Sequence, residues 1–366
     1  MNTKKITIAV EDDPFLRLIG VILDPATPAE RIAAFSDFFA HDLPDFDGWL
    51  RNLRARLKRL HPATVHIVED AAQWPEALAQ ADIAVAESLP VGAAELAAAP
   101  RLRVVQKFGT IAAGIDAAAC ATRGVKVRTL RRRANIACAE HALMLMLALA
   151  RRLPETANRI SIPQLQAAGF HPRTYDRHHT ANSNWARIPN LSLLHGATLG
   201  IAGMGEIGRE LAQRAAAFGM NILYYQRRPL PADAESALHL HASQLHYADF
   251  DTLLEASDWV VICLPGNDST RGLFEARRLN TMKPGARLIN ISRAEIVDRA
   301  ALINALRSGR LGGFALDPLY EAPGRDDDEL LQFRNVLITP HLAAQPRFNA
   351  LHDFTDLLLG LEEALT

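Results

Sequence analysis

The glycine-rich segment Gly203-Met-Gly-Glu-Ile-Gly208 places the strongest constraint on this chain. It follows an apolar run at 199–202 that is typical of a strand, and it opens a sequence typical of a helix. In that setting Gly203 allows a tight turn, Gly205 lets the backbone approach a pyrophosphate, and Gly208 lets the helix pack close to the strand. We therefore predict a dinucleotide site with contacts from Gly203, Met204, Gly205, Glu206, Ile207 and Gly208.

The residues that follow this motif bear on which dinucleotide binds. We expect the helix to cover 206–218 and to lead into a second strand at 222–225. NAD sites usually hold an Asp or Glu about 20 residues after the glycines, where it binds the ribose hydroxyls. Here the run Gln226-Arg227-Arg228 takes that place. Guanidiniums can pair with a 2′-phosphate that a carboxylate would repel, which favours NADP over NAD. The alternative is that both arginines are solvated at the end of a strand.

Composition limits the remaining possibilities. A chain of 366 residues that is 49% hydrophobic can form two domains with sizeable cores. Its 40 basic and 41 acidic side chains nearly cancel, so nucleic acid is not an expected partner. No signal peptide is recognised, and the longest apolar stretch, 142–150, is too short to span a bilayer. We interpret Cys120, Cys138 and Cys263 as reduced core residues of a cytoplasmic protein.

Short apolar runs alternate with helical patterns along the whole chain, which is typical of parallel α/β architecture. The sequence therefore predicts two doubly wound domains, each built on a parallel sheet. The expected strands of the first domain are 6–10, 65–68, 83–86, 104–106 and 125–127. In the second domain, after the strands at 198–202 and 222–225, they are 259–264, 288–291, 314–316 and 336–339.

Three segments stand apart from this alternation. The sequence 139–152 is apolar nearly all round, so we expect a helix that is buried on several sides and connects the domains. The segment 25–57 interrupts the first domain with charged, helical sequence. The segment 160–189 is polar and contains His171, His178 and His179, but it lacks the spacing of metal ligands. We interpret it as a surface arm and expect no metal.

Two polar residues follow expected strands of the second domain, where ligands of open α/β sheets bind. Arg293 could grip a carboxylate with two parallel hydrogen bonds. His341 follows Pro340 and could carry a proton near neutral pH, as the reduction of a ketone requires. Taken singly, each has an ordinary alternative: Arg293 could form a salt bridge, and His341 could be a satisfied loop histidine.

Several motifs in order make the chain resemble the D-isomer-specific 2-hydroxyacid dehydrogenases, the relatives of phosphoglycerate dehydrogenase and glyoxylate/hydroxypyruvate reductase. The resemblance runs from about Leu89 to His341. The motifs are 91–105, 139–143, 203–208, Leu264-Pro265, 270–272, 290–293, Leu316-Asp317 and Pro340-His341.

The resemblance implies roles for particular residues and a division of the chain. A flavodoxin-like substrate domain would comprise 1–152 and 342–366, and a Rossmann domain for NAD(P) would comprise 153–341. Arg293 would bind the carboxylate and ketone of the substrate, His341 would be the acid/base, and Asp317 would contact the nicotinamide amide. The remaining contacts would come from Leu264 and Pro265 to the cofactor, and from Lys107, Phe108, Gly109 and Thr110 to the substrate.

The chain also departs from the family pattern. The family usually has a Glu directly before the proline at position 323, where it pairs with the catalytic His, but this chain has Ala322 there. Either Glu321, one residue earlier, reaches His341, or His341 works unpaired, with a lower pKa that keeps it neutral at pH 7. The run Leu130-Arg-Arg-Arg133 replaces a common Pro-Gly element, and with Lys107 it hints at a second anionic group on the substrate.

These observations together predict an oxidoreductase that interconverts a 2-keto acid and a D-2-hydroxy acid with NAD(P)H. Two alternatives stay open. The same scaffold could oxidise a small anion such as formate or phosphite, or the chain could be a nucleotide-sensing binding protein similar to a corepressor. The family resemblance also implies a homodimer formed through the helix at 139–150.

Overall fold

The computed structural model describes residues 5–241 and 243–366, which divide into two compact units. The first unit contains the residues up to Asn135 together with Ala344–Thr366, and the second contains Ile136–Ala343. The chain thus returns to the first unit with its last helix, as expected. The observed boundary at 135/136 falls in the first turn of the apolar helix at 133–150, whereas the predicted boundary lies after that helix, at 152/153.

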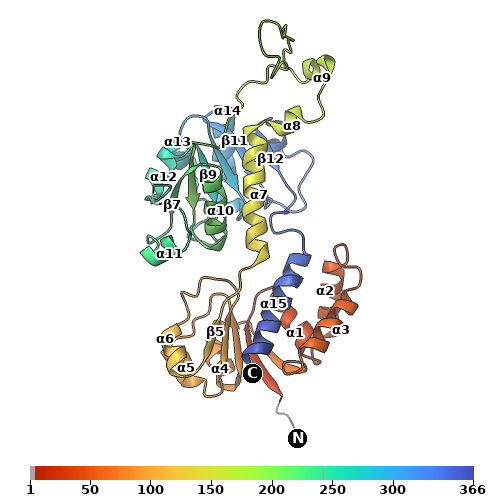
Figure 1. Cartoon of the computed structure of the whole chain (residues 1–366), viewed down its shortest axis with the longest axis vertical. Helices are drawn as coiled ribbons and strands as arrows, with labels where there is room; N and C mark the ends of the chain where they lie inside the picture. Colours follow the sequence, from red (N-terminus) through yellow and green to blue (C-terminus); the bar gives the residue numbers. More distant parts are fainter. Residues whose placement is uncertain (1–4, 242) are drawn as a thin grey trace. The chain divides into compact units, whose positions relative to one another are not determined.

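Within the described residues, the first unit has a five-stranded parallel sheet in the order β2-β1-β3-β4-β5 (Figure 1). This is the flavodoxin-like order. Alternate residues of β1 and β3 belong to two different apolar clusters, one on each face of the sheet, because successive side chains of a strand point to opposite faces. The strands are β1 Ile6–Glu11, β2 Ala63–Val68, β3 Ile83–Ala86, β4 Val104–Lys107 and β5 Lys126–Arg128.

Helices cover both faces of this sheet. The first cluster joins one face to α1 Leu18–Leu23, α2 Ala29–Phe39, α3 Phe46–Arg56 and α15 Phe348–Ala364. The second cluster joins the other face to α4 Trp74–Gln80, α5 Ala93–Ala98 and α6 Ala117–Thr122. The predicted insertion at 25–57 therefore forms α2 and α3, which pack on the core through residues such as Phe39 and Leu53.

The second unit has, within the described residues, a seven-stranded parallel sheet in the order β12-β11-β10-β9-β6-β7-β8. The first strand of this unit, β6, has β7 on one side and β9 on the other, which is the Rossmann arrangement with its switch point between β6 and β9. The strands are β6 Thr198–Ala202, β7 Asn221–Tyr225, β8 Leu245–Tyr247, β9 Trp259–Ile262, β10 Ala286–Asn290, β11 Leu311–Leu316 and β12 Val336–Ile338.

The helices of the second unit also cover both faces of its sheet. On one face lie α7 Arg133–Ala150 and α10 Glu206–Ala217. On the other face lie α12 Phe250–Ala256, α13 Ala276–Thr281 and α14 Arg299–Arg307. Shorter helices are α8 Leu153–Thr156, α9 Ile162–Ala167 and α11 Ala232–Ser236. The predicted fold class, two doubly wound parallel α/β domains, is confirmed.

The apolar helix α7 is longer than the apolar stretch singled out in the sequence. Its 18 residues have a mean hydropathy of 1.2, which is enough by length and composition alone to cross a membrane. Such a test is weak, because core helices of soluble proteins also pass it. Here Ala139, Ala142 and Met146 are fully buried and pack against β6 and β9 in the core of the second unit. The packing is that of a core helix.

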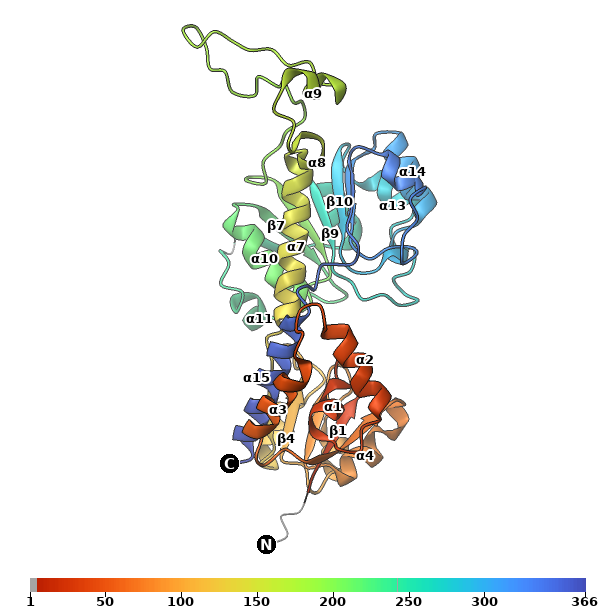
Figure 2. The same ribbon diagram turned by 90° about the vertical axis from the view of Figure 1, so that its right-hand side faces the viewer.

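The segment 160–189 extends away from the body of the second unit (Figure 2). It begins with α9 and continues mostly without regular structure. A small apolar cluster around Leu165, Phe170 and Ile188 holds it together. Both features agree with the predicted arm.

Candidate functional site

The glycine turn after β6 has the geometry that its motif predicts. Gly203 has φ +106°, a left-handed value that favours glycine, and a Cβ there would lie 2.5 Å from the carbonyl oxygen of Cys263. Cys263 directly follows β9, so the turn lies at the switch point of the sheet. This is where open α/β sheets bind their ligands.

The other two glycines differ in what surrounds them. A Cβ on Gly208 would lie 2.2 Å from the carbonyl oxygen of Gly203, so only glycine lets α10 approach the turn this closely. A Cβ on Gly205 would meet nothing within 4 Å. Gly205 precedes α10 directly, so the open space beside it lies at a helix N-terminus with its positive dipole end. The turn therefore fits a dinucleotide pyrophosphate, and the predicted packing role of Gly208 is confirmed.

The residues after β7 lie at the same edge of the sheet, next to the glycine turn. Gln226 is half-buried, whereas Arg227 and Arg228 are exposed. Neither guanidinium forms a hydrogen bond or ion pair within the part of the chain that the structure describes. They are thus available to an anionic ligand, but nothing in the chain fixes their direction.

Arg293 follows β10 at this edge. Its backbone is held because the Asn290 side-chain amide donates to the Arg293 carbonyl oxygen at 2.8 Å. Its side chain lies against Gly266, where a Cβ would come within 2.4 Å of the Arg293 Cγ. Its exposed guanidinium donates only to the neighbouring Ser292 carbonyl oxygen, at 2.7 Å, and forms no ion pair with any described residue. The salt-bridge alternative for Arg293 therefore finds no support among these residues.

Leu264 and Pro265 begin the loop that follows β9 and contains Gly266. The Thr270 hydroxyl donates to the Pro265 carbonyl oxygen at 2.7 Å and accepts from the Asn267 N–H at 3.0 Å. These two bonds close the loop into a compact turn at the carboxyl edge. The start of this loop lies next to the glycine turn, since a Cβ on Gly203 would come within 3.0 Å of the Leu264 nitrogen.

His341 lies in a turn after β12 that is built around Asp317. The Asp317 carboxylate is 0% exposed and accepts the N–H groups of Leu342 and Ala343 at 2.7 and 2.9 Å. The N–H of His341 itself donates to the Asp317 carbonyl oxygen at 3.0 Å. His341 has φ +58°, and its side chain is exposed. The His341 side chain is therefore exposed, while Asp317 fixes the backbone of the turn through these hydrogen bonds.

A second pair of side chains completes this network. The Thr339 hydroxyl donates to Asp317 at 2.6 Å and lies 3.0 Å from Nε2 of His141 on α7. Burial alone would raise the pKa of Asp317, but the hydrogen bonds from His141, Thr339 and the two backbone N–H groups outweigh it and lower the pKa to about 2. Asp317 is therefore ionised throughout the neutral range.

These hydrogen bonds bear on the predicted role of Asp317 in cofactor binding. The family resemblance implies that its carboxylate contacts the nicotinamide amide. In the structure the carboxylate is buried and bonded to the turn that carries His341, so such a contact would require this turn to open. The contact stays a prediction, whereas the bonds to the turn are observed.

Glu321 and His341 are not joined in the structure. Glu321 is exposed, and no ion pair links it to His341 among the residues described. Glu321 lines a cavity of about 680 Å³ together with Thr339 and Pro340, the two residues before His341. The idea that Glu321 replaces the usual glutamate stays a prediction.

The predicted substrate loop lies in the first unit, after β4. The Lys107 ammonium donates to the Glu87 carbonyl oxygen, and Gly109 has φ +156° with its carbonyl accepting the Leu130 N–H at 2.8 Å. Phe108 does not fit the expected role, because its N–H donates to the Ala86 carbonyl oxygen at 2.8 Å and its ring is 3% exposed. A contact from the amides of Gly109 and Thr110 to a substrate carboxylate stays a prediction.

The arginine run after β5 is largely engaged within the first unit. Arg132 stacks on the Phe108 ring at 4.0 Å and pairs with Glu87 at 3.3 Å. Arg133 pairs with Asp353 at 2.9 Å and Asp356 at 2.8 Å. These pairs account for two of the three guanidiniums, which weakens the suggestion that the run binds a second anionic group of the substrate.

Comparison with known proteins agrees with this site. A family model described as "D-isomer specific 2-hydroxyacid dehydrogenase, NAD binding domain" matches residues 143–343, more than half of the chain. The chain belongs to this family. It is therefore an NAD(P)-dependent oxidoreductase of the D-2-hydroxyacid dehydrogenase type, which interconverts a 2-keto acid and a D-2-hydroxy acid.

Relatives of known name support the assignment to this dehydrogenase family. The glyoxylate/hydroxypyruvate reductase B of Erwinia tasmaniensis is 33% identical over 319 residues, which is 84% of this chain and 92% of that protein. A glyoxylate reductase of Thermococcus gammatolerans is 34% identical over 67% of this chain and 68% of that protein. A D-3-phosphoglycerate dehydrogenase of Archaeoglobus fulgidus is 32% identical over 72% of this chain, which spans only 46% of that protein.

The fold of this dehydrogenase is also similar to solved structures. The crystal structure of a glyoxylate reductase from Paecilomyes thermophila matches with a TM-score of 0.54 and 23% identity, covering 99% of this chain and 95% of that one. At this identity the match supports the fold alone.

Sequence reasoning missed the supporting residues His141 and Thr339. Both residues belong to or adjoin motifs noted in the sequence, since His141 is part of the 139–143 motif and Thr339 directly precedes Pro340. No spacing rule links a helix residue to a turn about 200 residues later. Only the packing of α7 against the sheet brings them together.

Proposed function

We propose that this dehydrogenase performs its chemistry at the carboxyl edge of the second unit's sheet, with Arg293 binding the substrate and His341 transferring the proton. The observation that supports this most is the fixed turn around Asp317, which holds His341 outward at the edge that also carries Arg293 and the glycine turn. A proton carrier held in place lowers the cost of reaching the reactive geometry.

Each residue has a distinct part in the proposed reaction. The reduced nicotinamide cofactor, when bound, supplies the hydride that adds to the keto carbon. Arg293 pairs with the carboxylate and oxygen of the 2-keto acid through its free N–H groups, which orients the carbonyl. His341 donates a proton to the carbonyl oxygen as it becomes a hydroxyl, so no free alkoxide accumulates. In the reverse direction the neutral imidazole accepts that proton.

The substrate is proposed to be a small 2-keto acid of the glyoxylate and hydroxypyruvate class, after the names of the relatives. The test is the oxidation of NADPH and NADH by the purified protein with a panel of 2-keto acids. Turnover with at least one small 2-keto acid is expected. Reduction of NADP+ or NAD+ by formate or phosphite, with no turnover of a 2-keto acid, would favour the alternative reaction. Binding of dinucleotide without turnover of any substrate would favour a sensing protein.

For the cofactor we propose a preference for NADP. The support is that Gln226 stands where a carboxylate would repel the 2′-phosphate, and that Arg227 and Arg228 are exposed and unpaired among the described residues. A guanidinium that reaches the phosphate adds a charge-assisted hydrogen bond of roughly 1.5 to 3 kcal/mol.

We propose further that the protein is a homodimer. On α7, Met144 and Leu147 are 47% and 37% exposed, although the neighbouring Leu145 and Met146 are buried. Exposed apolar side chains of this size favour an interface with a second copy. Sedimentation or light scattering at micromolar concentration should give twice the chain mass, and a monomer would contradict the proposal.

A cytoplasmic location is proposed as well. Its support is that Cys120 and Cys263 form no disulfide among the described residues, which suits a reducing compartment. Fractionation of cells that produce the protein, followed by immunoblotting of the soluble and membrane fractions, tests this.

A further inference from the structure

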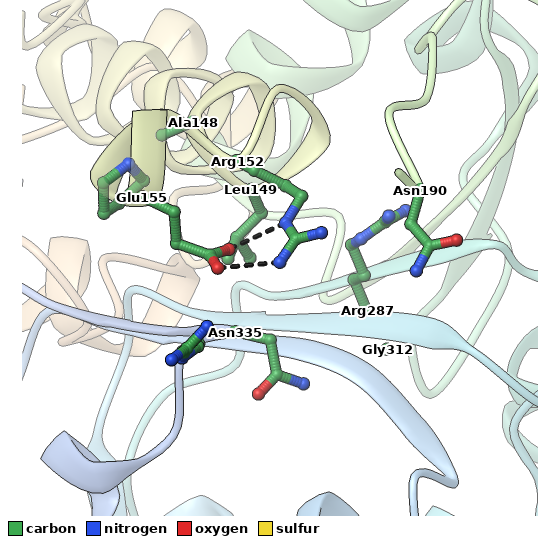
Figure 3. A pocket seen from close by; sticks show the side chains of 10 residues that line it. Ala148, Leu149, Arg152, Glu155, Asn190, Arg287, Gly312 and Asn335 are labelled. Carbon is green, nitrogen blue, oxygen red and sulfur yellow. Dashed lines mark hydrogen bonds and ion pairs between the residues drawn. The ribbon is translucent and has the colours of Figure 1, made fainter. Parts of the chain in front are cut away.

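A second cavity lies at the opposite, amino-terminal edge of the second unit's sheet (Figure 3). It has a volume of about 280 Å³, room for a small metabolite and its hydration water. Its polar lining comes from the starts of β10 and β11, the residues just before β12, the end of α7, α8 and the end of the arm. These polar side chains are Arg152, Glu155, Asn190, Arg287, Arg334 and Asn335.

Arg287 is the unusual member of this lining. Its guanidinium lies 4.7 Å over the ring of the buried Trp259, and its Cγ passes within 3.6 Å of where a Cβ on Gly313 would stand. The guanidinium forms no hydrogen bond or ion pair with any residue in 5–241 or 243–366, although the backbone N–H of Arg287 donates to the Asp258 carbonyl oxygen at 3.0 Å. Burial, with no compensating carboxylate, lowers the pKa of Arg287. No nitrogen of the Arg287 guanidinium is buried without a partner among the described residues, so its N–H donors are open to solvent.

The two other guanidiniums are already fixed. Arg152 pairs with Glu155 through two bonds of 2.8 and 2.7 Å, drawn as dashed lines in Figure 3, and Arg334 donates to the Ala168 carbonyl oxygen at 3.1 Å. The lining therefore carries three guanidiniums against one carboxylate, a formal excess of two positive charges. Two asparagine side chains, Asn190 and Asn335, add neutral donors and acceptors around the same space.

The contact with Trp259 does not account for this arrangement. A cation–π contact engages one face of the guanidinium and leaves its in-plane N–H donors unbonded. Figure 3 draws Arg287 and Asn190 among the side chains that line the cavity. Donors that face a confined, positively charged space suit an oxyanion, which can accept two parallel hydrogen bonds from one guanidinium.

We propose that this amino-edge cavity binds a small dianion with phosphate or carboxylate oxygens, held mainly by Arg287 and assisted by the positive charge of Arg152 and Arg334. The site lies at the edge opposite the catalytic residues, so its ligand is neither substrate nor cofactor. The proposal does not depend on the catalytic roles assigned to Arg293 and His341.

Titration calorimetry of the purified full chain tests this, with inorganic phosphate as the tetrahedral probe and malonate as the dicarboxylate probe. We expect saturable binding of at least one probe and a matching rise in the midpoint of thermal unfolding. Arg287→Met keeps the length of the side chain but removes its donors, and it should weaken binding at least tenfold. Arg287→Lys should recover part of the affinity, because it restores the charge.

Three further variants make the outcome decisive. Arg334→Met changes an exposed lining residue and should weaken binding even if Arg287→Met proves unable to fold. Arg151→Met removes the same charge next to the cavity from a residue outside its lining, and it should leave binding unchanged. Arg293→Met reports on anions at the catalytic edge. Three results would overturn the proposal. The first is that neither probe binds saturably. The second is that binding is lost in Arg293→Met but kept in Arg287→Met, and the third is that Arg151→Met and Arg287→Met lose equal affinity.

Discussion

The turn after β12 and the turn after β7 both present predicted site residues at the carboxyl edge of one sheet, but they are held differently. The first rests on the buried Asp317, whose carboxylate binds two of its backbone N–H groups. In the second, the side chains of Arg227 and Arg228 have no partner among the described residues. The comparison suggests that His341 is positioned by the protein itself, whereas the two arginines take their final direction from the ligand.

The largest effect on stability should come from removing the charge that holds the first turn. Asp317→Asn replaces an acceptor by a donor that faces a backbone N–H, and it leaves a buried polar group unsatisfied. We expect the free energy of unfolding to fall by about 2–4 kcal/mol and turnover to fall at least tenfold. Urea unfolding and steady-state kinetics measure both.

A matched control separates this effect from a general loss of charge. Asp268 is an exposed carboxylate in the loop after β9, and its side chain forms no hydrogen bond or ion pair with the residues that the structure describes. Asp268→Asn should change the free energy of unfolding by less than about 0.5 kcal/mol. If Asp317→Asn behaves like Asp268→Asn, the turn after β12 is not held as described.

Protonation of Asp317 at low pH should remove the stabilisation that its ionised carboxylate gives to the turn after β12. The folded pKa of Asp317, about 2, lies below the reference value of 3.8, so its stabilisation is complete above pH 4 and is lost as the pH falls toward 2. The shift corresponds to roughly 2 kcal/mol. The stability difference between the unmodified protein and Asp317→Asn, measured by urea unfolding, should shrink through this window. A difference that stays constant from pH 4.5 to pH 2 would contradict the assigned pKa.

A smaller effect is expected at the second turn. The unmodified protein should prefer NADPH to NADH at least tenfold in kcat/KM, which corresponds to about 1.4 kcal/mol. Gln226→Asp combined with Arg227→Ala should reverse the preference, because it restores repulsion and removes a phosphate donor. Equal or better kcat/KM with NADH in the unmodified protein would mean that the arginines stay in solvent.

The fold could be predicted in most of its elements because each depends on local patterns. The strand at 83–86 matches β3 residue for residue, and the helix predicted at 206–218 is α10 with one residue fewer. The short strand β8 was missed because it is mostly exposed and carries no apolar run. The boundary between the two compact units differs from the predicted domain boundary, because an all-round apolar helix gives no sign of which core it joins.

The site could be predicted only in part. Gly203, Gly205 and Gly208 are set by backbone geometry, which leaves a direct mark on the sequence. Side chains that act through long-range contacts cannot be recognised from local sequence. His141 contacts Thr339 in the turn that carries His341, and Phe108 is buried against Phe354 of α15 at a ring distance of 5.5 Å. The position of Glu321 relative to His341 likewise depends on the path of a loop.

The measurement that tests the central claim most directly is the turnover of Arg293→Ala and His341→Ala with the best 2-keto acid. His341→Ala should slow reduction at least about a hundredfold with cofactor affinity nearly unchanged, and Arg293→Ala should abolish turnover. The exposed arm residues Arg177 and His178 provide controls, and their alanine variants should keep normal rates. Near-normal turnover in both Arg293→Ala and His341→Ala would contradict the claim that the carboxyl edge of the second unit carries the chemistry.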